Sequence, residues 1–92
     1  MPARFNLAET TVFIPEAALH PVIGEFRKAG LAVLPHPVPA VHHDKDGSTP
    51  GRMIDVLGLY SPLAQTLAEI LSANSLNGLN DPVIIFPFIL SE

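Results

Sequence analysis

The stretch Val41 to Arg52, with the sequence VHHDKDGSTPGR, concentrates side chains that can bind metals or move protons. Zinc accepts imidazole and carboxylate ligands of the kinds gathered here. The candidate metal ligands are His42, His43, Asp44 and Asp46. Adjacent residues of a strand point to opposite faces, so the two histidines would not converge on one ion.

The same stretch also departs from a calcium-binding loop, because His42 and Met53 stand where that pattern needs acids. Polar residues bounded by glycine and proline are typical of a turn. The sequence therefore favours the tip of a β-hairpin. A metal site, or a loop ordered by a partner, remains an alternative.

Asp55 is the acid whose surroundings in the sequence are most unusual, because it lies within the apolar run MIDVLGL. A buried carboxylate needs a partner, solvent or a functional role. An ion pair with Arg52 or Arg4 is the favoured interpretation. If the chain is an enzyme, His36, Asp55 and Tyr60 are its candidates for proton transfer. No nucleophile with its base, and no phosphate-binding loop, can be assembled from residue spacing.

Composition indicates one α+β domain over residues 1–92 that associates with other chains. Hydrophobic residues make up 48% and charged residues 15%, against about 25% charged in typical domains. Such an apolar excess in a small domain predicts surface buried against another chain. The net charge of −4 argues against nucleic-acid binding. The chain has no cysteine, which excludes disulfides and thiolate metal sites.

The longest apolar run, residues 83–90, is too short for a membrane-spanning helix, and no secretory signal is recognisable near the first residue. We therefore expect a cytoplasmic protein without a membrane association. No cofactor is predicted.

Residue patterns predict the order β-α-β-β-α-β. Strands are expected at 10–14, beginning as early as Phe5, and at 31–43, 52–60 and 83–90. A first helix is expected before Gly30, either kinked at Pro21 or beginning near His20. A second helix is expected from Ser61 as N-cap to Asn74. This order is typical of the ferredoxin-like fold, a four-stranded antiparallel sheet with two helices on one face.

Prolines locate the edges of this sheet. Pro35, Pro37 and Pro39 would remove hydrogen-bond donors from one side of the second strand only, and Pro87 interrupts the fourth. Edge strands tolerate such losses and central strands do not. The first and third strands should therefore be central. A polyproline-type loop is the alternative for residues 31–43.

The third and fourth strands are apolar on both faces, although two helices can cover only one face of the sheet. We therefore expect a non-catalytic interaction module, a homodimer packed through its sheet face or an edge strand, which could also bind another protein. The predicted interface residues are Met53, Leu57, Phe86 and Phe88. A small dimeric enzyme or ligand-binding protein with a cavity between sheet and helices is the first alternative. Metal binding through the His42/His43 loop is the second.

Overall fold

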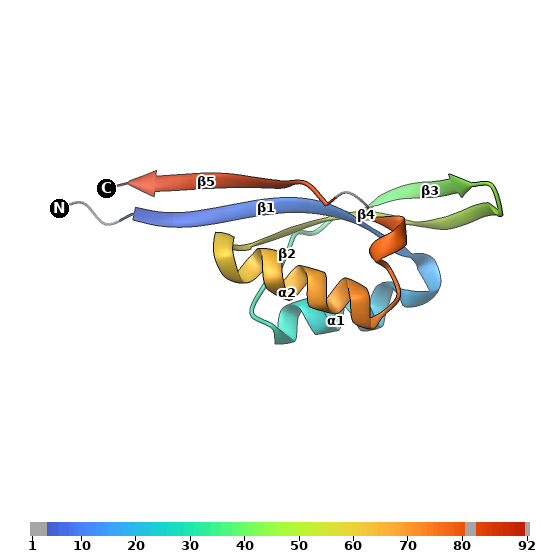
Figure 1. Cartoon of the computed structure of the whole chain (residues 1–92), viewed down its shortest axis with the longest axis horizontal. Helices are drawn as coiled ribbons and strands as arrows, with labels where there is room; N and C mark the ends of the chain where they lie inside the picture. Colours follow the sequence, from blue (N-terminus) through green and yellow to red (C-terminus); the bar gives the residue numbers. More distant parts are fainter. Residues whose placement is uncertain (1–3, 81–82, 92) are drawn as a thin grey trace.

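The computed structural model describes residues 4–80 and 83–91, and the side chains of residues 7–80 and 83–87. One antiparallel sheet lies on one side of the molecule and two helices lie on the other (Figure 1). The strands are β1 (Arg4–Pro15), β2 (Ala32–Val33), β3 (Val38–Asp44), β4 (Gly47–Leu59) and β5 (Ile85–Ser91). The helices are α1 (Leu19–Lys28) and α2 (Tyr60–Ala73), with short 3₁₀ turns η1 (Glu16–Ala18) and η2 (Asn77–Leu79).

The two longest strands, β1 and β4, form the centre of the sheet. They pair from Leu7 opposite Leu59 to Pro15 opposite Gly51. β5 lies outside β1, whereas β2 and β3 share the outer edge of β4. The predicted α+β class, antiparallel sheet and two helices are confirmed. The predicted count of four strands is wrong, because the sheet has five, and its order departs from the expected one at this divided edge.

The edge divides because the chain leaves the sheet between β2 and β3. Val33 pairs with Val56 and Val38 pairs with Met53, so four edge residues face only two residues of β4. His36, between Pro35 and Pro37, has a φ of 68°, which a regular strand does not allow. The continuous edge strand expected over residues 31–43 is therefore wrong at 34–37.

The prolines of the two edge strands β3 and β5, Pro39 and Pro87, lie where the edge argument needs them. The side chain of Asn80 bonds both the N–H and the C=O of Phe13, so this residue turns its backbone toward the β5 side. Every second residue of a strand turns its backbone groups to the same side, so the backbone of Glu9 also points toward β5, where Glu9 pairs with Phe86. Pro87, the next residue, therefore turns its nitrogen to the free edge. In β3, Asp44 pairs with Gly47 next to the two-residue turn, so the backbone of Asp44 points toward β4. Alternation back along β3 turns the nitrogen of Pro39 away from β4, toward the other free edge of the sheet.

Both helices begin with a proline in their first turn. α1 starts at Leu19, so Pro21 removes no internal hydrogen bond, and Gly30 follows its C-cap at a φ of 85°. α2 starts at Tyr60 with Leu59 as its N-cap, so the prediction that Ser61 caps this helix is wrong. Asn74 is its C-cap as expected, and its side chain accordingly donates to the carbonyl of Ile70.

The hydrophobic core lies between the helices and one face of β1 and β4. Alternate residues of β1 and β4 point into it, as the two-residue period of a strand requires. Phe26 of α1 and Leu63, Leu67 and Leu71 of α2 close it from below. Thr10 is the buried polar residue among the described side chains, and its hydroxyl donates to the carbonyl of Ile84 at 2.7 Å.

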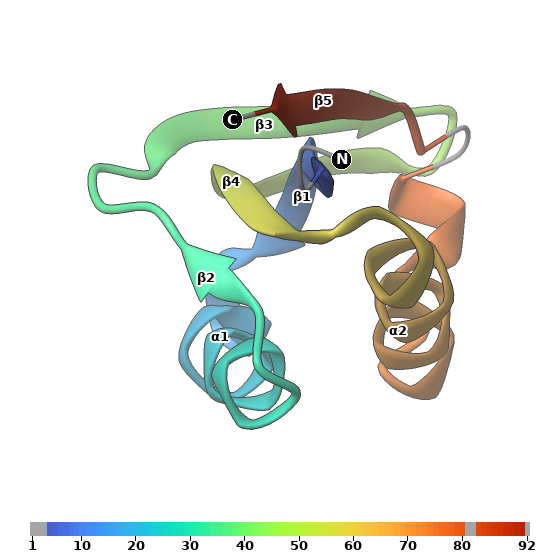
Figure 2. The same ribbon diagram turned by 90° about the vertical axis from the view of Figure 1, so that its left-hand side faces the viewer.

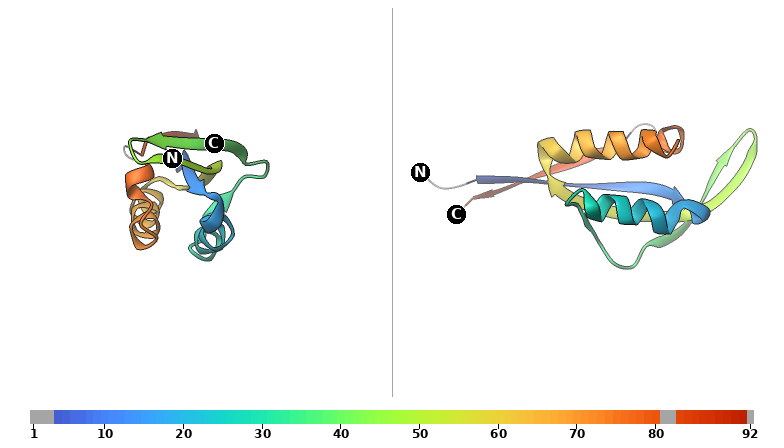
Figure 3. Two further views of the ribbon diagram at one scale, coloured as in Figure 1. Left: turned by 90° about the vertical axis from the view of Figure 1, so that its right-hand side faces the viewer. Right: turned by 90° about the horizontal axis from the view of Figure 1, so that it is seen from below.

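The molecule is elongated, with extents of 53 × 24 × 23 Å. Its radius of gyration is 14.0 Å, against about 12 Å for a compact chain of this length. The cause is visible in Figures 1 and 3, where the β3–β4 hairpin extends past the helices at one end and β1 with β5 extends at the other. No helix of the described residues is long and apolar enough to cross a membrane.

Candidate functional site

The sheet surface opposite the helices, called the open face below, carries most of the side chains that the sequence singled out. Figure 2 shows both helices below the sheet. Strand register assigns the residues of this face, because directly opposed residues of antiparallel strands share a face. The open face comprises Leu7, Glu9, Thr11, Phe13, Val38, Ala40, His42, Met53, Asp55, Leu57, Leu59 and Phe86.

Apolar side chains on the open face are unusually exposed. Phe86 is 57% exposed, Val38 60% and Leu59 53%, while Leu7, Met53 and Leu57 are half-buried. Ile54 and Val56 of β4 are buried under the helices, whereas Met53, Leu57 and Leu59 lie on the open face, so β4 is apolar on both faces. The predicted interface residues Met53, Leu57 and Phe86 all lie on this surface. The side chain of Phe88 lies outside the described residues, and register pairs its backbone with Leu7.

Asp55 lies in the middle of the open face and is only partly buried. The hydroxyl of Thr11, directly across from it on β1, donates to its Oδ1 at 2.6 Å. The expected ion pair with Arg52 is wrong, because Nε of Arg52 lies 3.5 Å from Oε2 of Glu16 instead. The other expected partner, Arg4, has a side chain outside the described residues. Among the described side chains, the hydroxyl of Thr11 is the hydrogen-bond partner of this carboxylate.

The three candidates for proton transfer are spread over different elements. His36 is exposed in the segment between β2 and β3, and Tyr60 is exposed at the first residue of α2. Asp55 is on β4, and no hydrogen bond or ion pair among the described side chains joins any two of the three. Catalysis by these residues therefore has no geometric support.

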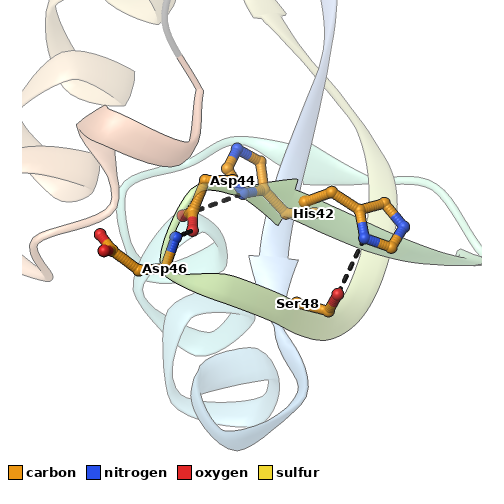
Figure 4. A network of polar contacts seen from close by, with 5 residues as sticks. His42, Asp44, Asp46 and Ser48 are labelled. Carbon is orange, nitrogen blue, oxygen red and sulfur yellow. Dashed lines mark hydrogen bonds and ion pairs between the residues drawn. The ribbon is translucent and has the colours of Figure 1, made fainter.

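The stretch from Val41 to Arg52 forms a hairpin whose two-residue turn is Lys45–Asp46. Oδ1 of Asp44 accepts the N–H of Asp46 at 2.8 Å, which stabilises this turn (Figure 4). Nδ1 of His42 lies 3.8 Å from Oδ2 of Asp44, and Nδ1 of His43 lies 2.8 Å from the hydroxyl of Ser48. The hairpin tip favoured from the sequence is what the chain forms. The turn is shorter than expected, because β4 begins at Gly47.

This hairpin brings only two of the four candidate metal ligands, His42 and Asp44, close to each other. Among the described residues, no group of three or more histidine, aspartate or glutamate side chains is arranged to hold an ion. Zinc sites need three or four such ligands. The prediction of a metal site therefore rests on one pair of side chains.

A hollow of about 270 Å³ opens on the open face where β1, β3 and β4 meet, and is called the socket below. Its lining consists of Thr11, Phe13, Ala40, Val41, His42, Met53, Leu79 and Asn80. Phe13 contributes an aromatic side chain to this lining that is only 4% exposed, and its ring centroid lies 5.9 Å from that of His42. Nδ1 of His42 is shielded from solvent and makes no hydrogen bond.

Asn80 fixes the rim of the socket and is not among the site residues predicted from the sequence. Its Oδ1 accepts the N–H of Phe13 at 2.6 Å, and its Nδ2 donates to the carbonyl of Phe13 at 2.9 Å. Nδ2 also donates to the carbonyl of Leu76 at 3.0 Å. The amide thus substitutes for a strand neighbour where β5 no longer accompanies β1. An asparagine in a Gly/Asn-rich loop has no sequence signal for this role.

A larger, open groove of about 930 Å³ lies between α2 and the segment that follows it. It is lined by Ala68, Glu69, Leu71, Ser72, Ala73, Asn77, Gly78, Asn80 and Val83. Glu69 is the one charged residue of this lining within residues 4–80 and 83–91. It carries no candidate chemistry of its own.

No model of a known protein family matches the chain, and a search of curated proteins gives no significant match. Solved structures are similar in fold. A Bacillus cereus protein related to NIF3 matches 98% of the chain with a TM-score of 0.65 and 12% identity. A nitrogen regulatory PII-like protein from Thiomonas intermedia, solved with ADP, AMP and bicarbonate, matches 98% with a TM-score of 0.53 and 9% identity. The chain spans 27% of the NIF3-related protein and 91% of the PII-like protein.

Proposed function

We propose that the chain is a non-catalytic assembly module that self-associates, with the open face of one copy packed on the open face of another. The observation that carries the proposal is the exposed apolar surface of a sheet whose other face is already filled by α1 and α2. Six apolar side chains on the open face would leave water on contact. They are Leu7, Val38, Met53, Leu57, Leu59 and Phe86.

The size of the open face suits a stable complex. The β1–β4 register runs over the nine residues from Leu7 to Pro15, which is about 30 Å of strand. β5 lies beside β1 only as far as Thr10 and β3 lies beside β4 only from Val38, opposite Met53, so about three strands lie side by side along most of this length, about 14 Å at about 4.8 Å per strand. This gives a projection of about 400 Å² for the paired centre, to which the corrugation of the side chains and the two extending ends of the sheet add. Stable interfaces bury about 800 Å² per partner, so a single such face is of the required order.

Both sheet edges are less suited to the contact than the face. Pro39 and Pro87 turn their nitrogens outward and remove donors that a neighbouring strand would need. The edge alternative to face packing is therefore disfavoured at β3 and at β5.

Native mass spectrometry of the untagged protein, combined with sedimentation equilibrium, tests the proposal. We expect a complex of two or more copies without added ligand mass. Phe86→Glu places a charge on the exposed apolar surface and should return the protein to monomers. Ala64→Glu, at an exposed position of α2, adds the same charge elsewhere and should leave the complex intact.

A wild-type protein that stays monomeric at high micromolar concentration would overturn the proposal. Bound mass of a few hundred daltons, or of a metal ion, would instead support the ligand-binding or metal alternatives.

A further inference from the structure

The open face carries a protruding ring and a hollow that suit each other. Phe86 projects from β5 with 57% of its surface exposed. Its register partner on β1 is Glu9, an open-face residue, whereas its neighbour Ile85 pairs with Thr10 and packs against the core. The phenyl ring of Phe86 therefore stands on the same side of the sheet as the socket.

The socket has the volume and the chemistry to hold a phenyl ring. A cavity of about 150 Å³ is sufficient for benzene, and the socket offers about 270 Å³. Met53, which is half-buried, supplies a thioether that makes favourable contacts with an aromatic ring, while Phe13 is 4% exposed and offers a small part of its side chain. Ala40, with the shortest apolar side chain of the lining, leaves the space above β3 unfilled.

Within one copy, Phe86 is not among the described residues that line the socket. Phe86 lies beside Glu9, and Phe13 is four residues further along β1, about 13 Å away. A second copy can reach it. Consider two stacked sheets related by a two-fold axis that runs between them, parallel to their faces. If the axis crosses the line between two points of the face at its midpoint and at a right angle, each point of one copy lies opposite the other point of the second copy.

We infer that Phe86 of each copy inserts into the socket of the other copy, so that the assembly is held by two equivalent ring-in-socket contacts. This inference rests on the proposed self-association through the open face and specifies which residues meet. Thr11, on the side of the socket nearer to Phe86, and Asp55 opposite it on β4 would come near the axis.

A double-mutant cycle with exchanged sizes tests the inference. Phe86→Ala removes the ring, and Ala40→Phe fills the socket. Each change alone should weaken self-association by at least about tenfold, as truncation of a central aromatic residue does in other interfaces. The double variant places the ring on β3 and the vacancy on β5. Its association should be at least about tenfold tighter than the product of the two single effects predicts.

Ile84 provides the matched control, because it is as exposed as Phe86 at 59% and lies two residues away. Ile84→Ala combined with Ala40→Phe should give additive effects. Ala40→Leu is a second socket variant for the case that the larger ring disturbs β3. Far-ultraviolet circular dichroism and the melting temperature of each variant show whether the monomer fold is kept.

Additive effects of Phe86→Ala and Ala40→Phe in a protein that still self-associates would overturn the ring-in-socket contact and leave the proposed function standing. A complex with an odd number of copies would overturn the reciprocal geometry. A wild-type monomer would overturn both the contact and the proposed function.

Discussion

Asp55 shows how a single side chain can limit an otherwise apolar contact. Burial of a carboxylate is costly unless it is paired, and its partner among the described side chains is the hydroxyl of Thr11. Alternation along β4 was enough to place Asp55 among apolar neighbours. Its partner could not be predicted, because the choice between Arg52 and Thr11 depends on the register of β1 against β4, two strands separated in the chain by a helix and two further strands.

Asp55→Asn should therefore tighten self-association, by about fivefold for about 1 kcal/mol of relieved repulsion between two copies. The asparagine oxygen still accepts from Thr11, so the fold is kept. The measurement is the dissociation constant by sedimentation equilibrium. Asp46→Asn, at the tip of the hairpin, removes the same charge away from the face and should leave the constant unchanged.

Asn80 acts through three hydrogen bonds, two of which it donates. Asn80→Asp keeps the acceptor for the N–H of Phe13 but turns a carboxylate oxygen toward two carbonyls. We expect a loss of about 2 kcal/mol in the free energy of unfolding, measured by urea denaturation at fixed protein concentration. Asn77→Asp, an exposed change in the same turn, should cost little. Equal losses for the two variants would contradict the role of Asn80.

At the scale of elements, the sequence predicted the helices and the central strands well, because their apolar periods are long and uninterrupted. Pro39 and Pro87 lie in edge strands as predicted, whereas Pro35 and Pro37 lie outside the strands. The break between β2 and β3 escaped prediction, since it needs a positive φ at His36 that no residue type demands. The early start of β4 was missed because glycine, serine and proline at 47–50 resemble a turn. Pairing with β3 overrides that local preference.

Gly51 is a strand residue whose missing side chain matters. A Cβ at this position would meet the carbonyl oxygen of Ile14 and, at 2.6 Å, the ring of Phe13. Gly51→Ala should therefore destabilise the protein by about 2 kcal/mol, with a fall in melting temperature on the order of 10 °C.

Gly24, within α1, is the contrasting position, because nothing lies within 4 Å of an added Cβ. Gly24→Ala should stabilise the protein by about 0.5–1 kcal/mol through the greater helix propensity of alanine. Thermal unfolding of the two variants side by side checks both signs. A harmless Gly51→Ala change would mean that β1 and β4 are not held as closely as described.

At the scale of the whole molecule, the apolar face of the sheet favours self-association and the net charge opposes it. The sheet offers a broad apolar face, whereas each copy carries a net charge of −4 and has Glu9 and Asp55 on that face. Two copies therefore repel each other before their apolar surfaces meet. The open face was foreseeable from strands that are apolar on both sides. The socket was not, because it depends on the side-chain packing of three strands and a loop.

Self-association should accordingly tighten with salt. Raising the ionic strength from about 0.02 to about 0.5 M shortens the screening length from about 20 to about 4 Å. We expect a dissociation constant several-fold lower at the higher ionic strength, measured by sedimentation in sodium chloride. A constant that rises with salt would point to a contact between opposite charges, at a surface other than the open face.

The offset between the two long strands has a consequence for motion. Gly47 to Pro50 of β4 lie beyond the end of β1 and have only β3 beside them. A two-stranded ribbon is marginally stable in water, so this arm opens without the rest of the sheet. Amide protons of His42 and Asp44 should exchange with solvent orders of magnitude faster than those of Val12 and Ile54. One continuous sheet thus joins a slowly exchanging centre to a rapidly exchanging arm, whose tip can adjust to whatever surface it meets.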